Sequence, residues 1–94
     1  MESSKLVFTG VLLKEEYSIT ALCPELDVAS EGENLEEAKN NLIEAVTLYI
    51  ESAVENNLPI LRPIPEEDNP FIKTPDKIEE KFLLKINFSV LAHA

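Results

Sequence analysis

Two side chains are of types that can act as a nucleophile or a general base, Cys23 and His93. A nucleophilic cysteine needs a neighbouring base and an electropositive setting that favours its thiolate form. Cys23 instead falls on the inward-facing set of a predicted strand among acidic residues, and His93 is the second-last residue. We therefore expect a buried, unreactive cysteine, a solvated histidine and no catalytic residue.

Carboxylates are abundant, because 18 Asp and Glu residues stand against 8 Lys and Arg residues, giving a net charge of -10. Metal-dependent phosphodiester chemistry needs carboxylates that converge from the core strands and hold cations. The predicted strands at residues 5–13 and 81–92 contain no Asp or Glu, and only Gly10 and Gly32 are available for a phosphate-binding loop. We expect no metal site, no cofactor and no enzymatic activity.

The acids concentrate between residues 25 and 57, where nine acids accompany one base, Lys39. Such a surface repels phosphate backbones, so direct nucleic-acid binding is not expected. A basic protein would be steered towards it. The alternative interpretation is a solvated helix face that keeps a small protein soluble.

Three strands and one helix must position these acids. Residues 5–13 are apolar on both alternating sets, which is typical of a central strand, and residues 17–23 form a second strand that Pro24 ends. Residues 28–31 form a short third strand. Asn34 is a suitable N-cap, with Glu37 at the third helical position, for a helix over residues 35–56.

The helix carries an apolar stripe at spacings of three and four, with Ile43 and Ile50 off it. Residues 58–80 hold Pro59, Pro63, Pro65, Pro70 and Pro75 and are predicted to be an acidic connector that packs in part on the domain. Residues 81–92 alternate cleanly and predict a final strand. Its inward side would carry Phe82, Leu84, Ile86, Phe88, Val90 and Ala92.

The chain of 94 residues is long enough for one modest core, so we expect a single domain over residues 1–94. No apolar run approaches the roughly 20 residues that span a bilayer, and the start MESSKLVF lacks the pattern of a signal peptide. One cysteine excludes an internal disulfide and suits a reducing compartment. We expect a cytoplasmic protein without membrane contact.

The composite of these elements resembles the HicB-like antitoxins. The matching pieces are a tyrosine-led strand ending in Cys-Pro-Glu-Leu at residues 23–26, the run Ser-Glu-Gly-Glu-Asn-Leu-Glu-Glu-Ala at residues 30–38, and the helix continuing to Leu48 and Tyr49. The resemblance implies an α+β, partial ribonuclease H-like fold of order β-β-β-α-β. In it the helix lies across three antiparallel strands and a fourth strand returns beside the first. A right-handed crossover would make that fourth strand parallel to the first.

The resemblance also implies a protein that binds and neutralises a small basic HicA-like toxin that cleaves RNA. Many HicB-like proteins continue into a DNA-binding module, whereas residues 81–94 have no room for its helices, so we do not expect operator binding by this chain. The predicted toxin-binding residues lie at the corner and the helix start: Glu25, Asp27, Glu31, Glu33, Glu36 and Glu37.

A hydrophobic edge on the final strand also predicts a homodimer. The residues assigned to its interface are Phe82, Leu83, Leu84, Ile86, Phe88, Val90 and Leu91. Two other functions remain open. One is a HicB-like protein-interaction or regulatory domain without a toxin partner, and the other is a residual hydrolase on a ribonuclease H-like scaffold.

Overall fold

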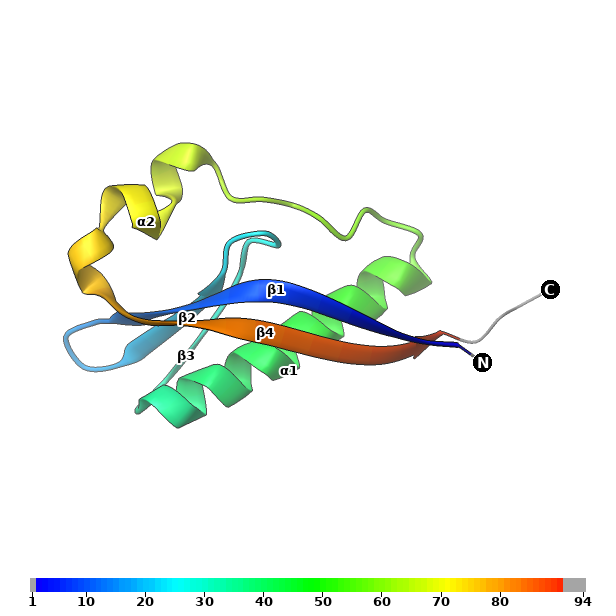
Figure 1. The fold of residues 1–94 in the computed structure, drawn as a ribbon, viewed down its shortest axis with the longest axis horizontal. Coiled ribbons are helices and arrows are strands. Elements are labelled where there is room, and N and C mark those ends of the chain that lie inside the picture. Colours follow the sequence, from blue (N-terminus) through cyan, green and yellow to red (C-terminus); the bar gives the residue numbers. More distant parts are fainter. Residues whose placement is uncertain (1, 91–94) are drawn as a thin grey trace.

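The computed structural model describes residues 2–90, and the side chains of residues 6–87 (Figure 1). The strands and the long helix follow the predicted order β-β-β-α-β. Their bounds are β1 (Glu2–Lys14), β2 (Ile19–Cys23), β3 (Val28–Gly32), α1 (Leu35–Glu55) and β4 (Ile78–Val90). Three short helical turns, η1 (Glu66–Asp68), α2 (Pro70–Lys73) and η2 (Pro75–Lys77), precede β4.

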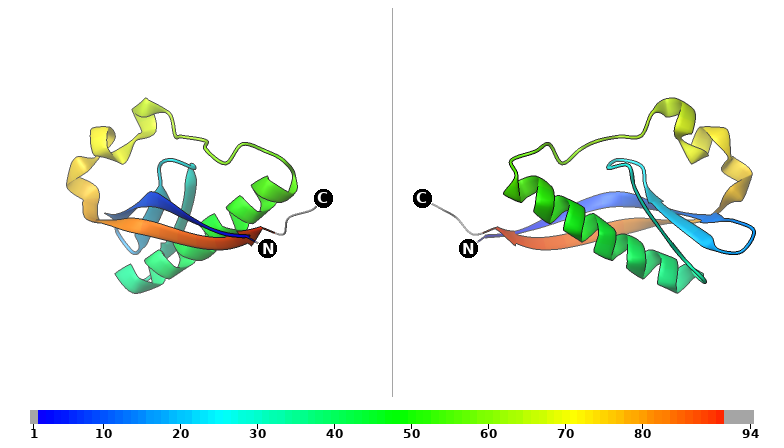
Figure 2. Two further views of the ribbon diagram at one scale, coloured as in Figure 1. Left: turned by 45° about the vertical axis from the view of Figure 1, so that its right-hand side comes forward. Right: turned by 180° about the vertical axis from the view of Figure 1, so that it is seen from behind.

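The four strands form one antiparallel sheet in the order β3-β2-β1-β4. β1 is a central strand, as its apolar residues on both faces predicted. It pairs with β2 only from Val11 to Lys14, whereas its pairing with β4 runs from Glu2 to Leu13. The β1–β4 ribbon therefore continues past the point where β2 ends, and α1 lies across one face of the sheet (Figure 2).

β4 runs antiparallel to β1, so the predicted parallel orientation was wrong. α1 carries the chain back towards the start of β1, and a crossover that ended there would give a parallel strand. The connector instead passes along the whole molecule to the opposite end before β4 begins (Figure 1). β4 therefore enters the sheet beside the end of β1.

The core lies between α1 and the sheet. Its buried side chains are Phe8, Leu12, Ala21, Cys23, Leu26, Ala38, Leu42, Val46, Ile50, Leu84 and Ile86. Ile50 is fully buried and belongs to this core, although it lies off the predicted stripe. Because α1 crosses the sheet at an angle (Figure 2), the buried side of the helix shifts between its first and last turns.

The start of α1 confirms the predicted cap. The backbone N–H of Glu37 donates to Asn34 Oδ1 at 2.8 Å, and the Glu37 carboxylate accepts from the backbone N–H of Glu33 at 3.3 Å. The first interaction satisfies one of the donors that the first helical turn leaves without partners, and the second bonds the residue before the cap to that turn. The first turn of α1 is thereby fixed against the end of β3.

The connector packs in part on the domain, as predicted. Ile60 packs against the core and Pro70 is buried. The backbone N–H groups of Arg62 and Ile64 donate to the carbonyls of Glu25 and Pro24, each at 3.0 Å. The final strand was predicted to begin at residue 81, but β4 already begins at Ile78. Within residues 2–90, no helix is both long and apolar enough to cross a bilayer.

Candidate functional site

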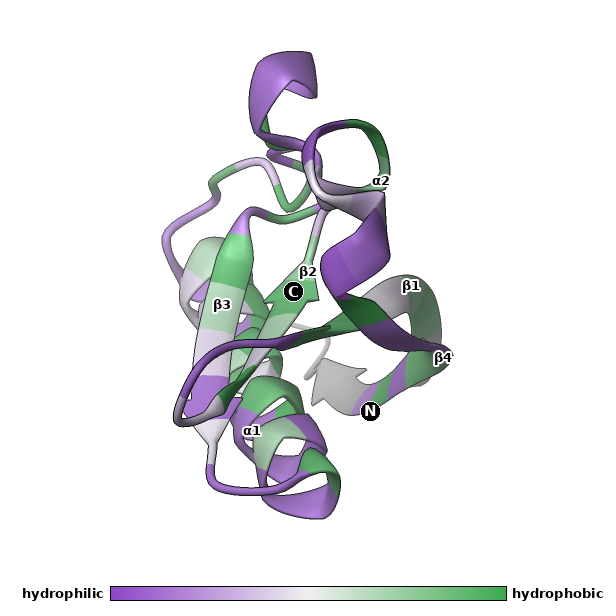
Figure 3. Ribbon diagram, turned by 90° about the vertical axis from the view of Figure 1, so that its left-hand side faces the viewer, coloured by the Kyte–Doolittle hydropathy of each residue, from purple (hydrophilic) through white to green (hydrophobic). Residues whose placement is uncertain are grey.

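The largest group of exposed acids lies where β3 ends and α1 begins. It continues along the side of α1 that borders β3. We call this surface the acidic flank and define it as Glu31, Glu33, Glu36, Glu37, Asn41, Glu44 and Leu48. Figure 3 shows the hydrophilic character of the loop before α1 and of the first helical turns.

Hydrogen bonds hold the two elements of the acidic flank together. Asn41 Nδ2 donates to the Glu31 carbonyl at 2.8 Å, which ties α1 to the edge strand β3. Gly32 allows close approach of these elements, because a Cβ there would lie 2.5 Å from the backbone nitrogen of Ala38. The carboxylates are therefore presented by a fixed strand-to-helix junction.

The acidic flank is shallow rather than deeply concave. One hollow of about 370 Å³ is lined by Asn34, Glu36, Glu37, Asn40 and Asn41. A second, of about 270 Å³, is lined by Ser30, Asn41, Glu44, Ala45 and Leu48. Leu48 is 59% exposed, so an apolar side chain stands beside the carboxylates. Carboxylates next to an exposed leucine are suited to a protein surface.

The acidic flank keeps its negative charge. The ion pairs among the described side chains join Lys39 to Glu80 and Lys77 to Glu15, and neither involves a flank carboxylate. Lys39, the one base in this part of the helix, also lies over the Phe82 ring at 5.1 Å from its centroid. Its ammonium is thus directed towards β4 and away from β3.

Glu25 and Asp27, also predicted to bind a toxin, lie at the other end of β3, in the corner between β2 and β3. Glu25 has a structural role. Its carboxylate accepts the Thr9 backbone N–H at 3.1 and 2.9 Å and the Thr9 hydroxyl at 2.9 Å. The Glu25 carboxylate takes the place of β2, with which β1 does not pair on the N-terminal side of Val11. Asp27 is exposed, so the six predicted residues fall into two separate groups.

Cys23 is fully buried beside Glu25. Burial, reinforced by the negative charge of Glu25, raises the pKa of the Cys23 thiol to about 12. A thiol with this pKa stays protonated at neutral pH and is a poor nucleophile. His93 lies outside the described residues.

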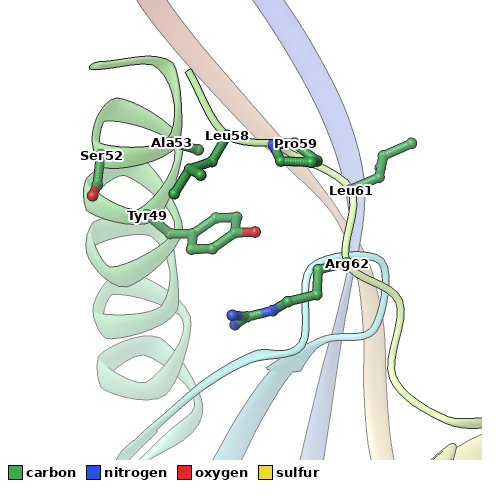
Figure 4. A pocket seen from close by; sticks show the side chains of 7 residues that line it. All are labelled: Tyr49, Ser52, Ala53, Leu58, Pro59, Leu61 and Arg62. Atoms are coloured by element: carbon green, nitrogen blue, oxygen red, sulfur yellow. The ribbon is translucent and has the colours of Figure 1, made fainter. Parts of the chain in front are cut away.

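An apolar hollow of about 290 Å³ opens beside the last turns of α1 (Figure 4). Tyr49 and Arg62 line this hollow, and Arg62 Cζ lies over the Tyr49 ring, 5.1 Å from its centroid. The Tyr49 hydroxyl donates to the Ile60 carbonyl at 3.0 Å. These contacts fasten the connector to α1. We assign the hollow a structural role.

The predicted dimer residues fall into three groups. The side chains of Leu84 and Ile86 are buried under α1 in the same chain, so a partner at this strand would contact their backbone only. Leu83 is 67% exposed on the opposite face, and Phe82 is half-buried over Gly10. For Phe88 and Val90 only the backbone is described, and Leu91 lies outside the described residues.

Sequence reasoning did not include Asn41, Glu44 and Leu48 in the site. A signal for them was present, since residues 37, 41, 44 and 48 recur at intervals of four and three and therefore share one side of a helix. The apolar stripe of the helix marks the neighbouring side, which packs against the sheet. No three His, Cys, Asp or Glu side chains in the described part of the chain are grouped to hold a metal ion.

Comparison with known proteins gives a similarity in fold. A chain of a solved structure titled "HicA3 and HicB3 toxin-antitoxin complex" superposes with a TM-score of 0.57 at 17% sequence identity. The match covers 86% of this chain and 95% of that chain. No protein-family model and no curated protein matches the sequence.

Proposed function

We propose that this protein is a cytoplasmic, non-enzymatic antitoxin that neutralises a small basic RNA-cleaving toxin of the HicA-like kind through the acidic flank. The observation that carries the proposal is a set of exposed carboxylates without ion-pair partners among the described side chains, held on a fixed junction beside the exposed Leu48. Charge steers a basic partner to this surface, and the leucine supplies apolar contact area.

Two observations support the proposal that this chain is the antitoxin of such a pair and not the toxin. The net charge of -10 opposes binding to RNA, which an RNA-cleaving enzyme must achieve. In addition, residues 30–38, which carry much of the resemblance to HicB-like antitoxins, form the end of β3 and the start of α1. The resembling residues and the acidic flank are thus the same part of the molecule.

Neutralisation would follow from competition for one surface. A basic enzyme that cleaves RNA holds phosphate groups with lysine and arginine side chains. Carboxylates on the acidic flank can pair with those side chains and exclude the substrate. Of the residues first considered, Glu31, Glu33, Glu36 and Glu37 are available for this role, with Asp27 more distant and Glu25 engaged with Thr9.

The test takes a small basic protein from the genes adjacent to this one and measures its RNA cleavage at low salt, with increasing amounts of the acidic protein. The wild type should inhibit cleavage, and the triple variant Glu33→Lys, Glu36→Lys, Glu37→Lys should raise the inhibition constant at least about tenfold. A matched control reverses three exposed acids of η1: Glu66→Lys, Glu67→Lys, Asp68→Lys. Absence of binding by the wild type, or equal losses in both variants, contradicts the proposal.

A second function uses the same surface without a toxin. The acidic flank would then bind a basic regulatory partner, as a protein-interaction domain. The cleavage assay separates the two functions, because the regulatory domain would bind through the acidic flank without inhibiting RNA cleavage.

A further inference from the structure

The outer edge of β4 is the longer of the two free edges of the sheet. β4 is the terminal strand, has 13 residues, and pairs with β1 on one side; within residues 2–90 no strand lies on its other side. A long strand edge of this kind presents backbone N–H and C=O groups that can pair with another strand. It is therefore a surface on which a second chain can add.

The charge of β4 differs from that of the rest of the protein. From Lys81 to Asn87 the strand contains two lysines and no acid, although the chain carries a net charge of -10. Lys81, Leu83 and Lys85 face away from α1, and Leu83 is 67% exposed. A second copy of this acidic chain meets the least repulsion here.

We propose that two copies of this chain pair antiparallel through their β4 edges, around a two-fold axis at Phe82. Glu79 of each copy then lies opposite Lys85 of the second copy. The result is a continuous eight-stranded sheet with an acidic flank at each end. The two acidic flanks are thereby far apart, and both remain open to other partners.

The charged side chains along the β4 edge select this register. A two-fold axis at Leu83 places Lys81 opposite Lys85, and an axis at Lys81 or Lys85 places that lysine opposite itself. Like charges directly opposite one another destabilise a strand pair. An axis at Leu84 creates no ion pair, whereas the axis at Phe82 creates two Glu79–Lys85 pairs and sets Lys81 opposite Leu83.

Glu79 and Lys85 are free to make these contacts. Both are exposed, and neither takes part in an ion pair among the side chains of residues 6–87. The β1–β4 register shifts between Leu12 and Leu13, so Glu79 is the extra residue of a bulge. A bulge increases local twist, which would end the pairing of the two copies at this point.

The experiment uses complementary charge reversals. Sedimentation velocity should show a dimer for the wild type at micromolar concentration. Glu79→Lys and Lys85→Glu should each weaken dimerisation at least about tenfold, because each replaces two attractive pairs by two repulsive pairs. An equimolar mixture of the two variants should restore a dimer, and native mass spectrometry should identify it as the heterodimer.

Controls of equal charge change are Glu67→Lys and Lys73→Glu, both at exposed positions in the connector. These should dimerise like the wild type, and circular dichroism should show that all variants are folded. A monomeric wild type, unaffected single variants, or a mixture that stays monomeric would each overturn the proposal. No toxin enters this experiment, so its failure leaves the proposed antitoxin function intact.

Discussion

The two outer strands of the sheet, β3 and β4, differ in length, charge and protection. β3 has five residues, lies beside the start of α1, and has its Glu31 carbonyl bonded to Asn41. β4 has 13 residues and carries Lys81, Leu83 and Lys85 away from the helix. Both are terminal strands of one sheet, yet α1 covers part of the β3 edge, whereas the outer edge of β4 is not covered by any strand within residues 2–90.

This difference separates two kinds of association. The β3 edge is short and partly bonded to α1, so a partner there contacts side chains, which are acidic. The β4 edge is long and regular beyond its bulge, so a partner there can pair with the backbone. We therefore assign the basic protein partner to the acidic flank beside β3, and the second copy to β4.

The largest expected effect is at the junction of β3 with α1. Gly32→Ala places a Cβ within 2.5 to 2.9 Å of backbone atoms of Glu37 and Ala38, which cannot move independently of the helix. Overpacking of this kind costs about 1–3 kcal/mol, and we expect the upper end of that range. Chemical denaturation measures it. A loss below about 0.5 kcal/mol would show that the helix is not fixed against this edge.

A somewhat smaller loss of stability is expected on the N-terminal side of Val11, where β1 pairs with β4 but not with β2. Glu25→Ala removes the acceptor of the Thr9 backbone N–H and should destabilise the fold by about 2 kcal/mol. Glu36→Ala, on the exposed helix surface, is the control and should change stability by less than about 0.5 kcal/mol. Equal effects of the two substitutions would mean that Glu25 has no special structural role.

The fold was largely predictable from local patterns. Alternation and Pro24 located the strands, and Asn34 with Glu37 located the start of the helix. The direction of β4 was not predictable in this way, because it depends on how far the connector travels before the strand begins. The burial of Ile50 likewise depends on the angle at which α1 crosses the sheet, which a helical stripe does not specify.

The candidate site was predictable in part. Charge density located the acids at the helix start, and the structure places Glu31, Glu33, Glu36 and Glu37 together there. Charge density alone could not show that Glu25 bonds to Thr9, which is 16 positions away in sequence. Contacts of this range arise from the fold. Such contacts give Glu25 a structural role, while glutamates without them remain exposed.

On the β4 side of the sheet, Gly10 offers a comparison with Gly32. A Cβ at Gly10 would lie 2.3 Å from the tip of the Phe82 ring, a side chain that can rotate. We expect Gly10→Ala to cost about 1 kcal/mol, less than Gly32→Ala. Thermal denaturation of the two variants side by side checks the order. A reversed order would mean that β4 is held more rigidly than β3.

The smallest expected effect concerns the hydrogen bond at the edge of β3. Asn41→Ala removes the donor to the Glu31 carbonyl and should cost about 0.5–1 kcal/mol. Native-state hydrogen exchange should become faster in β3 and remain unchanged in β4. Faster exchange in both strands would show that the two edges are not independent.

Hydrogen exchange in the complex with the small basic partner tests the central claim most directly. Exchange is measured for the protein alone and when saturated with that partner, under identical salt conditions. Binding through the acidic flank predicts slower exchange in residues 29–45, with exchange in β4 unchanged. Slower exchange in β4, or around Tyr49 and Arg62, with residues 29–45 unaffected, would contradict the assignment.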